Sequence, residues 1–225
     1  MNRIMIAAVG ALATLGAAGS AIAAELPTRV HYEVRDGDKP VGHIDITIEP
    51  SAQGFVAHQR GELTLRRMMI TAKVTQSIDE RWQDRRLLSL DSDTASEMTI
   101  GGARKTLAVA RDASGTLRAT ADKKTRELPA DALPLSIWYG PALVAGTHFD
   151  VTSGDLVDVQ PAADARADAP LRYQGDECRP LRLATRNADK KTSQVSAWVG
   201  SDGIVCEMRI SSGSDVFTYT RQPPP

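Results

Sequence analysis

The chain has 225 residues, of which 42% are apolar and 24% charged, proportions typical of a folded protein rather than a disordered one. Its 27 Lys and Arg residues nearly balance 28 Asp and Glu residues, which argues against a strongly basic nucleic-acid-binding protein. Aromatic residues make up only 4% of the chain, too few for a surface that stacks bases or sugars in series.

The first 23 residues have the three parts of an export signal. Arg3 supplies the positive start, Ile4–Gly19 is an uncharged Ala-rich stretch, and Ala21-Ile22-Ala23 is a small-x-small cleavage site. We expect a signal peptide over 1–23, cleaved at its end or one residue later. The alternative is an uncleaved anchor, but strongly apolar residues are too sparse here for a stable transmembrane anchor. The mature protein is therefore expected in the periplasm or outside the cell.

Alternation of apolar and polar residues with period two dominates the rest of the chain and predicts half-buried strands. Turn clusters such as Asp36–Pro40, Glu49–Gly54 and Asp112–Gly115 separate the strands. We expect one antiparallel β domain of about ten or eleven strands over 24–225, with an ordered core at about 28–221. The clearest strand-like runs are Val30–Arg35, His43–Glu49, Ile70–Thr75, Leu107–Ala110, Leu117–Thr120, Phe149–Thr152, Leu156–Gln160, Leu181–Thr185, Val195–Val199, Ile204–Ile210 and Val216–Thr220.

The register of the first three strands can be predicted, because their apolar faces must coincide and a slip of one residue would invert them. Pairing Tyr32 with Ile44 meets this requirement for the first hairpin. Pairing Ile48 with Phe55 meets it for the second.

This register aligns His31, Asp45 and His58 on the polar face of the predicted sheet. Two imidazoles beside a carboxylate fit a metal-binding or pH-sensing site. They also fit an ordinary solvated ladder of opposite charges. We favour the ladder and expect no metal, because no motif fixes a ligand set with metal-site spacing.

Cys178 and Cys206 are the two cysteines, and an exported protein favours a disulfide between them. A simple three-strand meander would place them on its outer strands, about 9.6 Å apart, which is too far to bridge. The bond therefore requires another strand order, or Cys178 in a lead-in loop beside Pro180. A metal site is the weaker alternative, since histidine partners are not nearby.

Recognisable catalytic motifs are absent from the sequence. It contains no Gly-x-Ser-x-Gly elbow, no His-Glu-x-x-His, no Cys-x-x-Cys and no phosphate-binding glycine loop. Asp79, Glu80 and Asp84 crowd near Trp82, but neighbouring arginines supply counter-ions for these acids. We therefore expect no enzymatic activity and no cofactor.

The most apolar stretch of the mature chain runs from Leu133 to Val144. It overlaps the best helical candidate, Ala132–Val144, which Pro134, Gly140 and Pro141 interrupt. One interpretation is a plug packed on the apolar face of the sheet, since large apolar residues are usually core. The other is the lid or wall of a hydrophobic pocket.

Several short motifs follow one another in a familiar order along residues 28–221. They are Tyr32-Glu33-Val34 before Val41-Gly42, Glu80-Arg81-Trp82 before Leu88-Ser89-Leu90-Asp91, Leu135-Ser136-Ile137-Trp138-Tyr139, and Ala197-Trp198-Val199 before Asp202-Gly203. In this the chain resembles exported bacterial domains of unknown function related to the lipoprotein-carrier (LolA/LolB-type) fold. The resemblance implies a curved antiparallel half-barrel with a short helix or loops packed in its concave side. Since carriers of this fold transport acyl chains, it also implies a possible hydrophobic ligand.

We therefore predict a non-catalytic exported protein that binds or carries a lipid or acyl ligand. The alternative is an envelope protein with a filled core that acts through protein–protein interaction; an enzyme of unrecognised type is a third hypothesis. A cavity favours the first, an exposed apolar patch the second, and convergent His and acid side chains in a cleft the third. The residues expected to line a ligand on the concave face are Ile44, Ile46, Ile70, Val74, Trp138 and Tyr139.

Overall fold

The structure is a computed structural model that describes residues 26–67, 70–99, 101–162 and 168–224. The expected signal peptide, 1–23, lies outside these residues. Within them, no helix is long and apolar enough to cross a membrane.

Sixteen strands account for most of the described chain. The first eight are β1 (Arg29–Asp36), β2 (Lys39–Ser51), β3 (Gly54–Arg67), β4 (Ile70–Gln83), β5 (Arg86–Met98), β6 (Gly102–Arg111), β7 (Leu117–Ala121) and β8 (Lys124–Leu128). The others are β9 (Leu133–Pro134), β10 (Gly146–Phe149), β11 (Leu156–Pro161), β12 (Leu171–Tyr173), β13 (Asp176–Asn187), β14 (Thr192–Val199), β15 (Val205–Ser212) and β16 (Asp215–Gln222). The expected helix at 132–144 is reduced to one 3-10 turn, η1 (Gly140–Ala142).

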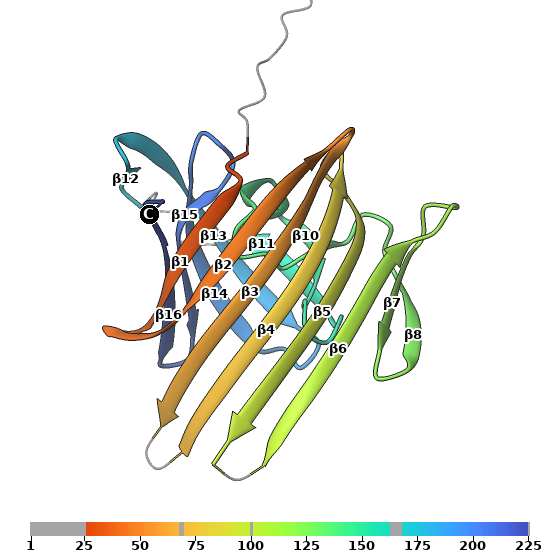
Figure 1. The fold of residues 1–225 in the computed structure, drawn as a ribbon, viewed down its shortest axis with the longest axis horizontal. Helices are drawn as coiled ribbons and strands as arrows, with labels where there is room; N and C mark the ends of the chain where they lie inside the picture. The colour runs from red at the N-terminus through yellow and green to blue at the C-terminus, as the bar shows by residue number, and fades with distance from the viewer. Residues whose placement is uncertain (1–25, 68–69, 100, 163–167, 225) are drawn as a thin grey trace, which may run out of the picture.

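The strands form one curved sheet in the order β8-β7-β6-β5-β4-β3-β2-β1-β16-β15-β14-β13-β11-β10-β9, and β12 pairs with β13 off this path (Figure 1). Every pairing is antiparallel except that of β9 with β10. The terminal strands of this order, β8 and β9, are not paired with each other, so the sheet is curved without closing. The expected all-β half-barrel is confirmed, although the strands are more numerous than the ten or eleven predicted.

The register of the first hairpin is confirmed, because Tyr32 pairs with Ile44. The register of the second is wrong by two residues: Ile48 pairs with Ala57, and Phe55 pairs with Pro50. The physical reason is the turn. Ser51 pairs with Gly54, so the chain reverses within two residues and not across the longer 49–54 loop that we expected. A shift of two keeps both apolar faces on the same side.

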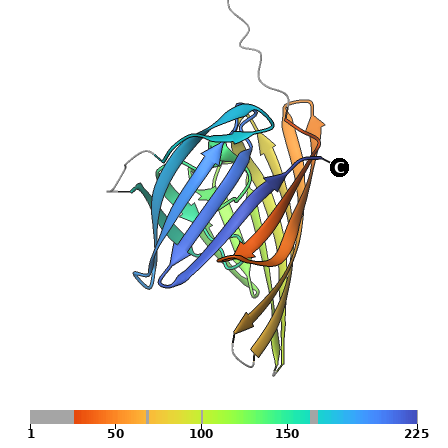
Figure 2. The ribbon, with the colours of Figure 1, turned by 90° about the vertical axis from the view of Figure 1, so that its left-hand side faces the viewer.

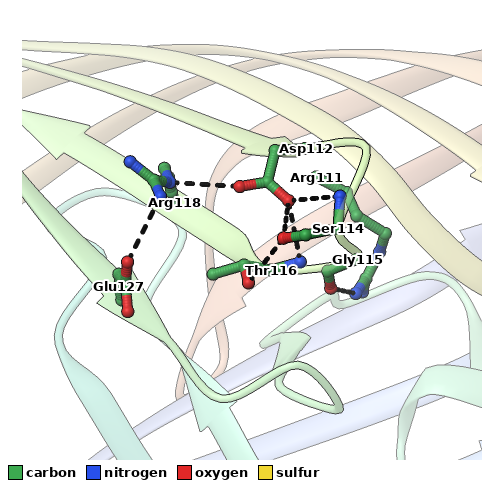
Figure 3. Close-up of polar contacts among 7 residues, drawn as sticks. All are labelled: Arg111, Asp112, Ser114, Gly115, Thr116, Arg118 and Glu127. Carbon is green, nitrogen blue, oxygen red and sulfur yellow. Dashed lines mark hydrogen bonds and ion pairs between the residues drawn. The ribbon is translucent and has the colours of Figure 1, made fainter.

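The β6–β7 turn, Asp112–Gly115, is confirmed, and one carboxylate organises it (Figure 3). Asp112 Oδ1 accepts hydrogen bonds from the backbone N–H groups of Ser114 (2.9 Å) and Thr116 (3.1 Å). The Ser114 hydroxyl, these N–H groups and Arg118 together hold the pKa of Asp112 below its usual range. Arg118 also reaches Glu127 on β8 at 3.3 Å, so the turn is tied to the next strand.

The predicted strand over Phe149–Thr152 is wrong beyond Phe149, where β10 ends. Asp150 Oδ1 accepts hydrogen bonds from the backbone N–H groups of Thr152 (2.9 Å) and Ser153 (2.8 Å). This carboxylate therefore turns the chain immediately after Phe149.

The concave face of the sheet carries two large apolar clusters. The first lies over β1–β7 and contains Tyr32, Ile46, Trp82 and Leu90 among its fully buried members. The second lies over β11 and β13–β15. Its buried members are Leu143, Val157, Val159, Leu183, Val195, Ala197, Val205 and Met208.

Strands β3–β6 continue past the rest of the sheet as two long hairpins, which we call the projection (Figure 2). Its inner face is apolar, because Leu63, Leu65, Val74, Ile70 and Met98 lie on the same side of the strands as the core residues. Ile70 is 58% and Met98 44% exposed, so neither is covered by the described chain.

Cys178 and Cys206 form a disulfide, with their Cα atoms 6.5 Å apart. They do lie on the outer strands of a meander, β13–β15, so our geometric objection to the bond was wrong. Two features explain this. The pairing of β13 with β14 begins at Arg179, so no middle strand separates the cysteines. Cys206 also falls at the irregularity where the β14–β15 register shifts, as the extra residue of a bulge.

We expect the disulfide to stabilise the fold, because it constrains an unfolded chain over a sequence separation of 28 residues. The Cys178→Ser/Cys206→Ser variant should lose about 3–4 kcal/mol of unfolding free energy, measured by urea titration. Reductant should destabilise wild type by a similar amount and leave the double variant unchanged. Equal urea midpoints for the oxidised wild type and the variant would contradict this role.

Candidate functional site

The chain between β8 and β11 crosses the concave side of the sheet, and we call Leu133–Phe149 the plug segment (Figure 1). Backbone hydrogen bonds attach it to the sheet: Val205 N–H donates to the Trp138 carbonyl and Gly140 N–H to the Gly203 carbonyl, both at 2.9 Å. A Cβ atom on Gly140 would lie 2.4 Å from Val199 Cγ1, so the approach requires glycine. The expectation of a loop packed in the concave side is confirmed.

Over the first cluster the plug is packed by aromatic rings. Tyr139 lies with its ring centroid 5.3 Å from that of Phe55 and 5.1 Å from that of Trp82. Trp138 lies 5.8 Å from Phe55 and 5.3 Å from Tyr139. These are ordinary separations for interacting aromatic rings, and they fill the space beneath this part of the plug.

One carboxyl group, that of Glu80, is buried among these rings with 3% of the residue exposed. The indole N–H of Trp82 donates to Glu80 Oε2 at 2.7 Å. Burial dominates and raises the pKa of Glu80 to about 7, although the Trp82 and Trp138 N–H groups favour the charged form. Glu80 therefore titrates near neutral pH inside an apolar core.

Over the second cluster the plug does not fill the space, and a cavity of about 200 Å³ remains. The plug forms one wall, and β11, β13, β14 and β15 form the other. The lining is mainly apolar and consists of Leu135, Ser136, Ile137, Leu143, His148, Val159, Leu183, Thr185, Ser193, Val195, Met208 and Ile210.

His148 is the one titratable side chain in this lining, and only 1% of it is exposed. Its Nε2 lies 2.8 Å from the Val144 carbonyl oxygen, whereas its Nδ1 is buried and has no hydrogen-bond partner among the described residues. Burial lowers the pKa of His148 and outweighs the Val144 and Pro134 carbonyls, which favour the charged ring. The imidazole is therefore neutral at pH 7. An unpaired buried acceptor of this kind costs about 1–3 kcal/mol.

One part of the cavity lining lies beside the turn between β13 and β14. Thr185 and Ser193 pair across these strands close to that turn, and they are half-buried, as is Ile210. The pairings through β15, β16, β1 and β2 place the turn at the same end of the sheet as the projection (Figure 2).

The structure does not bring the six predicted ligand-lining residues together, and none of them lines this cavity. Four of them, Ile44, Ile46, Trp138 and Tyr139, are buried in the first cluster. Ile70 and Val74 lie on the projection, exposed and half-buried respectively. Their assignment to a ligand stays a prediction.

The polar face carries the predicted ladder with altered partners. His31 Nδ1 lies 2.7 Å from Asp45, but the second imidazole beside this carboxylate is that of His43, at 3.5 Å. His58 instead lies 2.9 Å from Asp79, since the β2–β3 register is shifted. Among the described residues no group of three or more His, Cys, Asp or Glu side chains can hold a metal ion.

Asp79 is also bound by Arg60, whose Nη1 lies 3.0 Å from the carboxylate. Partial burial alone would raise the pKa of Asp79, but the hydrogen bonds from His58 and Arg60 outweigh it and lower the pKa. These exposed pairs contribute little to stability.

Sequence reasoning missed the cavity and His148 because the two walls come from parts of the chain far apart in sequence. β10 is short, and its consecutive residues His148 and Phe149 are both buried, so no alternation marks the inward position. The antiparallel pairing of β10 with β11 could be expected from adjacent strand-like runs. The position of β13–β15 opposite the plug segment could not be expected from the sequence.

Comparison with known proteins identifies the family. A family model described as "Domain of unknown function (DUF6134)" matches residues 32–222. The chain belongs to this family. The expected membership of a family of unknown function is thus confirmed, whereas the relation to lipoprotein carriers is taken up below.

A solved structure from Brucella abortus, titled a beta-barrel-like protein of domain of unknown function DUF1849, has the same fold. It matches with a TM-score of 0.56 and 13% sequence identity, over 88% of this chain and 96% of that one. At this identity the likeness supports the fold alone. The sequence has no significant match among curated proteins.

We expect the buried Glu80 to make wild type less stable as pH rises. Its pKa is about 7 when folded, against an ordinary value of 4.5, so the folded state binds more protons between these values. The stabilising contribution of Glu80 is therefore fully present below pH 4.5. The free energy of unfolding then falls as pH rises through 7, by up to about 3 kcal/mol in total.

The Glu80→Gln variant should remove this loss of stability at high pH. Its amide oxygen can still accept the hydrogen bond from the Trp82 indole N–H. The variant should match wild type at pH 4 and exceed it by up to about 3 kcal/mol at pH 8, measured by urea unfolding across this range. A difference that does not change with pH would contradict the buried, protonatable carboxyl.

Proposed function

We propose that this protein is exported and binds one small apolar ligand in the cavity between the plug segment and β11–β15, without catalysing a reaction. The observation that carries the proposal is the cavity itself: about 200 Å³ of mainly apolar space, with a buried histidine in its lining. Packed protein interiors contain few voids larger than a water molecule, so an apolar space of this size fits a ligand.

Export is supported by the signal-like segment at 1–23 and by the Cys178–Cys206 disulfide, a bond typical of oxidising compartments. The periplasm is therefore the proposed location, as is expected for a protein that resembles lipoprotein carriers. The shared features are a curved antiparallel sheet and a plug in its concave side.

The size of the cavity limits the ligand. An engineered protein cavity of about 150 Å³ holds one benzene molecule, and drug-sized ligands occupy about 300–1,000 Å³. A cavity of about 200 Å³ therefore suits one ring or one short acyl chain. It is too small for the several long acyl chains of a lipoprotein, so we propose a smaller cargo.

Native mass spectrometry of the protein purified gently from the periplasm, followed by organic extraction, tests this function. We expect a bound mass that is released on extraction and identified as a small lipid or other apolar compound. A bare mass that stays unchanged when lipids and small apolar compounds are offered would overturn the proposal.

We expect the Thr185→Leu/Ser193→Leu variant to lose the bound mass, because two leucines at this cross-strand pair of the lining would fill space that the ligand needs. The matched control is Ala184→Leu/Gln194→Leu, a neighbouring cross-strand pair on the opposite face. The control should retain the ligand in the same native mass spectrum. If both variants lose the ligand equally, or both retain it equally, the ligand does not bind in this cavity.

The exposed inner face of the projection favours a second candidate function, docking to an envelope protein that presents an apolar segment. Ile70 and Met98 are the observation that supports it, because large apolar side chains in an exposed group often mark an interaction site. Under this alternative the cavity has no ligand and the projection carries the function.

Ile70→Ser/Met98→Ser distinguishes the two. Since both side chains are already exposed, we expect a change in unfolding free energy within about 0.5 kcal/mol. The ligand-binding function predicts an unchanged bound mass in this variant, whereas the docking function predicts loss of envelope partners captured by cross-linking in cells. Retained partners would contradict docking.

A further inference from the structure

We propose that the protein has a second ligand site, which binds the headgroup of an anionic amphiphile beside β6 and holds its apolar chain on the inner face of the projection. The headgroup is an oxyanion, a carboxylate or a phosphate. The inference goes beyond the proposed function, because this site is separate from the cavity beside His148. It is argued from a cavity lined by cations and from the apolar surface next to that cavity.

The headgroup site is a cavity of about 500 Å³ where three parts of the chain meet. These parts are β6, the hairpin of β7 and β8, and the turn between β10 and β11. The lining consists of Lys105, Thr106, Ala121, Asp122, Lys124, Arg126, Thr152, Ser153 and Asp155. None of these residues lines the first cavity.

The three cations of this lining lie on the concave face of the sheet. Lys105 is two residues from the buried Leu107 on β6, so the two side chains share a face. Arg126 pairs with the buried Ala119, and Lys124 is two residues from Arg126 on β8. The concave face also carries both apolar clusters, and charged groups on such a face need water or a partner of opposite charge.

Only one of the three cations has such a partner. Nη1 of Arg126 lies 2.9 Å from Asp155 Oδ1, and its Nη2 donates to the Ser153 carbonyl oxygen at 3.0 Å. Lys105 and Lys124 are exposed, and neither forms an ion pair with any of the described residues. Their ammonium groups are therefore accessible to a ligand and available to bind it.

The polar groups around the two lysines favour an anion. Thr152 Oγ1 accepts a hydrogen bond from Gln76 Nε2 at 3.5 Å, and its own proton has no acceptor among the described residues. The lining as a whole holds three cations and the two carboxylates of Asp122 and Asp155, a net charge of one positive unit. An oxyanion accepts hydrogen bonds from ammonium and hydroxyl groups together, whereas a cationic headgroup is repelled.

The apolar part of the ligand is inferred from the adjoining part of the projection. Toward its tip, the next inward-facing row after Lys105 contains Leu63, Val74 and Ala103. Successive inward-facing rows are about 7 Å apart, within reach of a short acyl chain. Leu63 and Val74 are only half-buried, and Met98, one row further, is exposed. Cations at one end and uncovered apolar surface at the other fit an amphiphile better than a free anion.

Isothermal titration with decanoate at pH 7.5 tests the inference. In Lys105→Gln/Lys124→Gln the dissociation constant of decanoate should rise about tenfold, because two cationic partners are removed. That of decan-1-ol, which has the same chain without the charge, should stay within about twofold. The matched control is Lys73→Gln/Lys191→Gln, which removes two exposed lysines outside the lining and should leave both constants within about twofold. Equal weakening of decanoate in both variants, or in neither, would overturn the headgroup site.

Acetate, which has the headgroup without the chain, separates an amphiphile from a free anion. We expect wild type to bind acetate at least about tenfold more weakly than decanoate, since acetate buries no apolar chain. Equal affinities would overturn the amphiphile.

The Thr185→Leu/Ser193→Leu variant separates this site from the proposed function. Decanoate binding should persist in that variant even if it loses the ligand of the first cavity. Loss of decanoate there, with no change in Lys105→Gln/Lys124→Gln, would place decanoate in the first cavity and overturn the second site.

If the lysine variant does not fold, wild type provides the readout. Raising NaCl from about 0.05 M to about 0.5 M should weaken decanoate binding several-fold and leave decan-1-ol unchanged, because salt screens exposed charges. An equal response of both probes would overturn the inference.

Discussion

The structure depends on one constraint: a long curved sheet has an apolar concave face that must be covered, and a single segment covers it. Sheets of this kind hold together through their backbone pairings, but the apolar side chains of both clusters need a second layer. The plug segment supplies that layer, and backbone hydrogen bonds to Gly203 and Val205 fix its position. Within the sheet, the Tyr32 hydroxyl on β1 donates to the Val205 carbonyl at the start of β15 at 2.6 Å.

The plug covers the two halves of the sheet differently, and this difference creates the candidate site. Over β1–β7 it contributes Trp138 and Tyr139, whose rings reach Phe55 and Trp82 and fill the interior. Over β11–β15 it contributes smaller or flexible side chains such as Ser136 and Leu143. These side chains line the cavity without filling it. Glu80 is buried in the filled half and His148 in the open half. In both, burial favours the neutral form: it raises the pKa of Glu80 to about 7 and lowers the pKa of His148.

Much of the fold could be predicted from local patterns. The alternation in β1 and β2 specified their register, and the apolar run at Leu133–Val144 indicated the plug. The strand count was too low because some strands are polar on both faces and some turns have unusual sequences. In β5, Ser92 and Thr94 face inward, and the turn before β5 places Asp84 and Arg85 at positive φ without glycine or asparagine.

The candidate site could not be predicted, for a different physical reason. The cavity exists because the plug lies opposite β13–β15, and this depends on how the sheet curves and not on any one segment. The six residues chosen from the sequence are apolar and were expected on the concave face. Apolar character predicts burial, but it does not distinguish a packed interior such as that around Ile46 from the wall of a cavity.

The central claim is that the space beside His148 is apolar and accessible, and a crystal structure determined under xenon pressure tests it most directly. The account predicts a xenon atom between the plug segment and β13–β15, in contact with Leu143, Leu183 or Met208, because dry apolar cavities of this size bind xenon. A cavity collapsed onto its own side chains, or filled by ordered waters that bond His148, would contradict it.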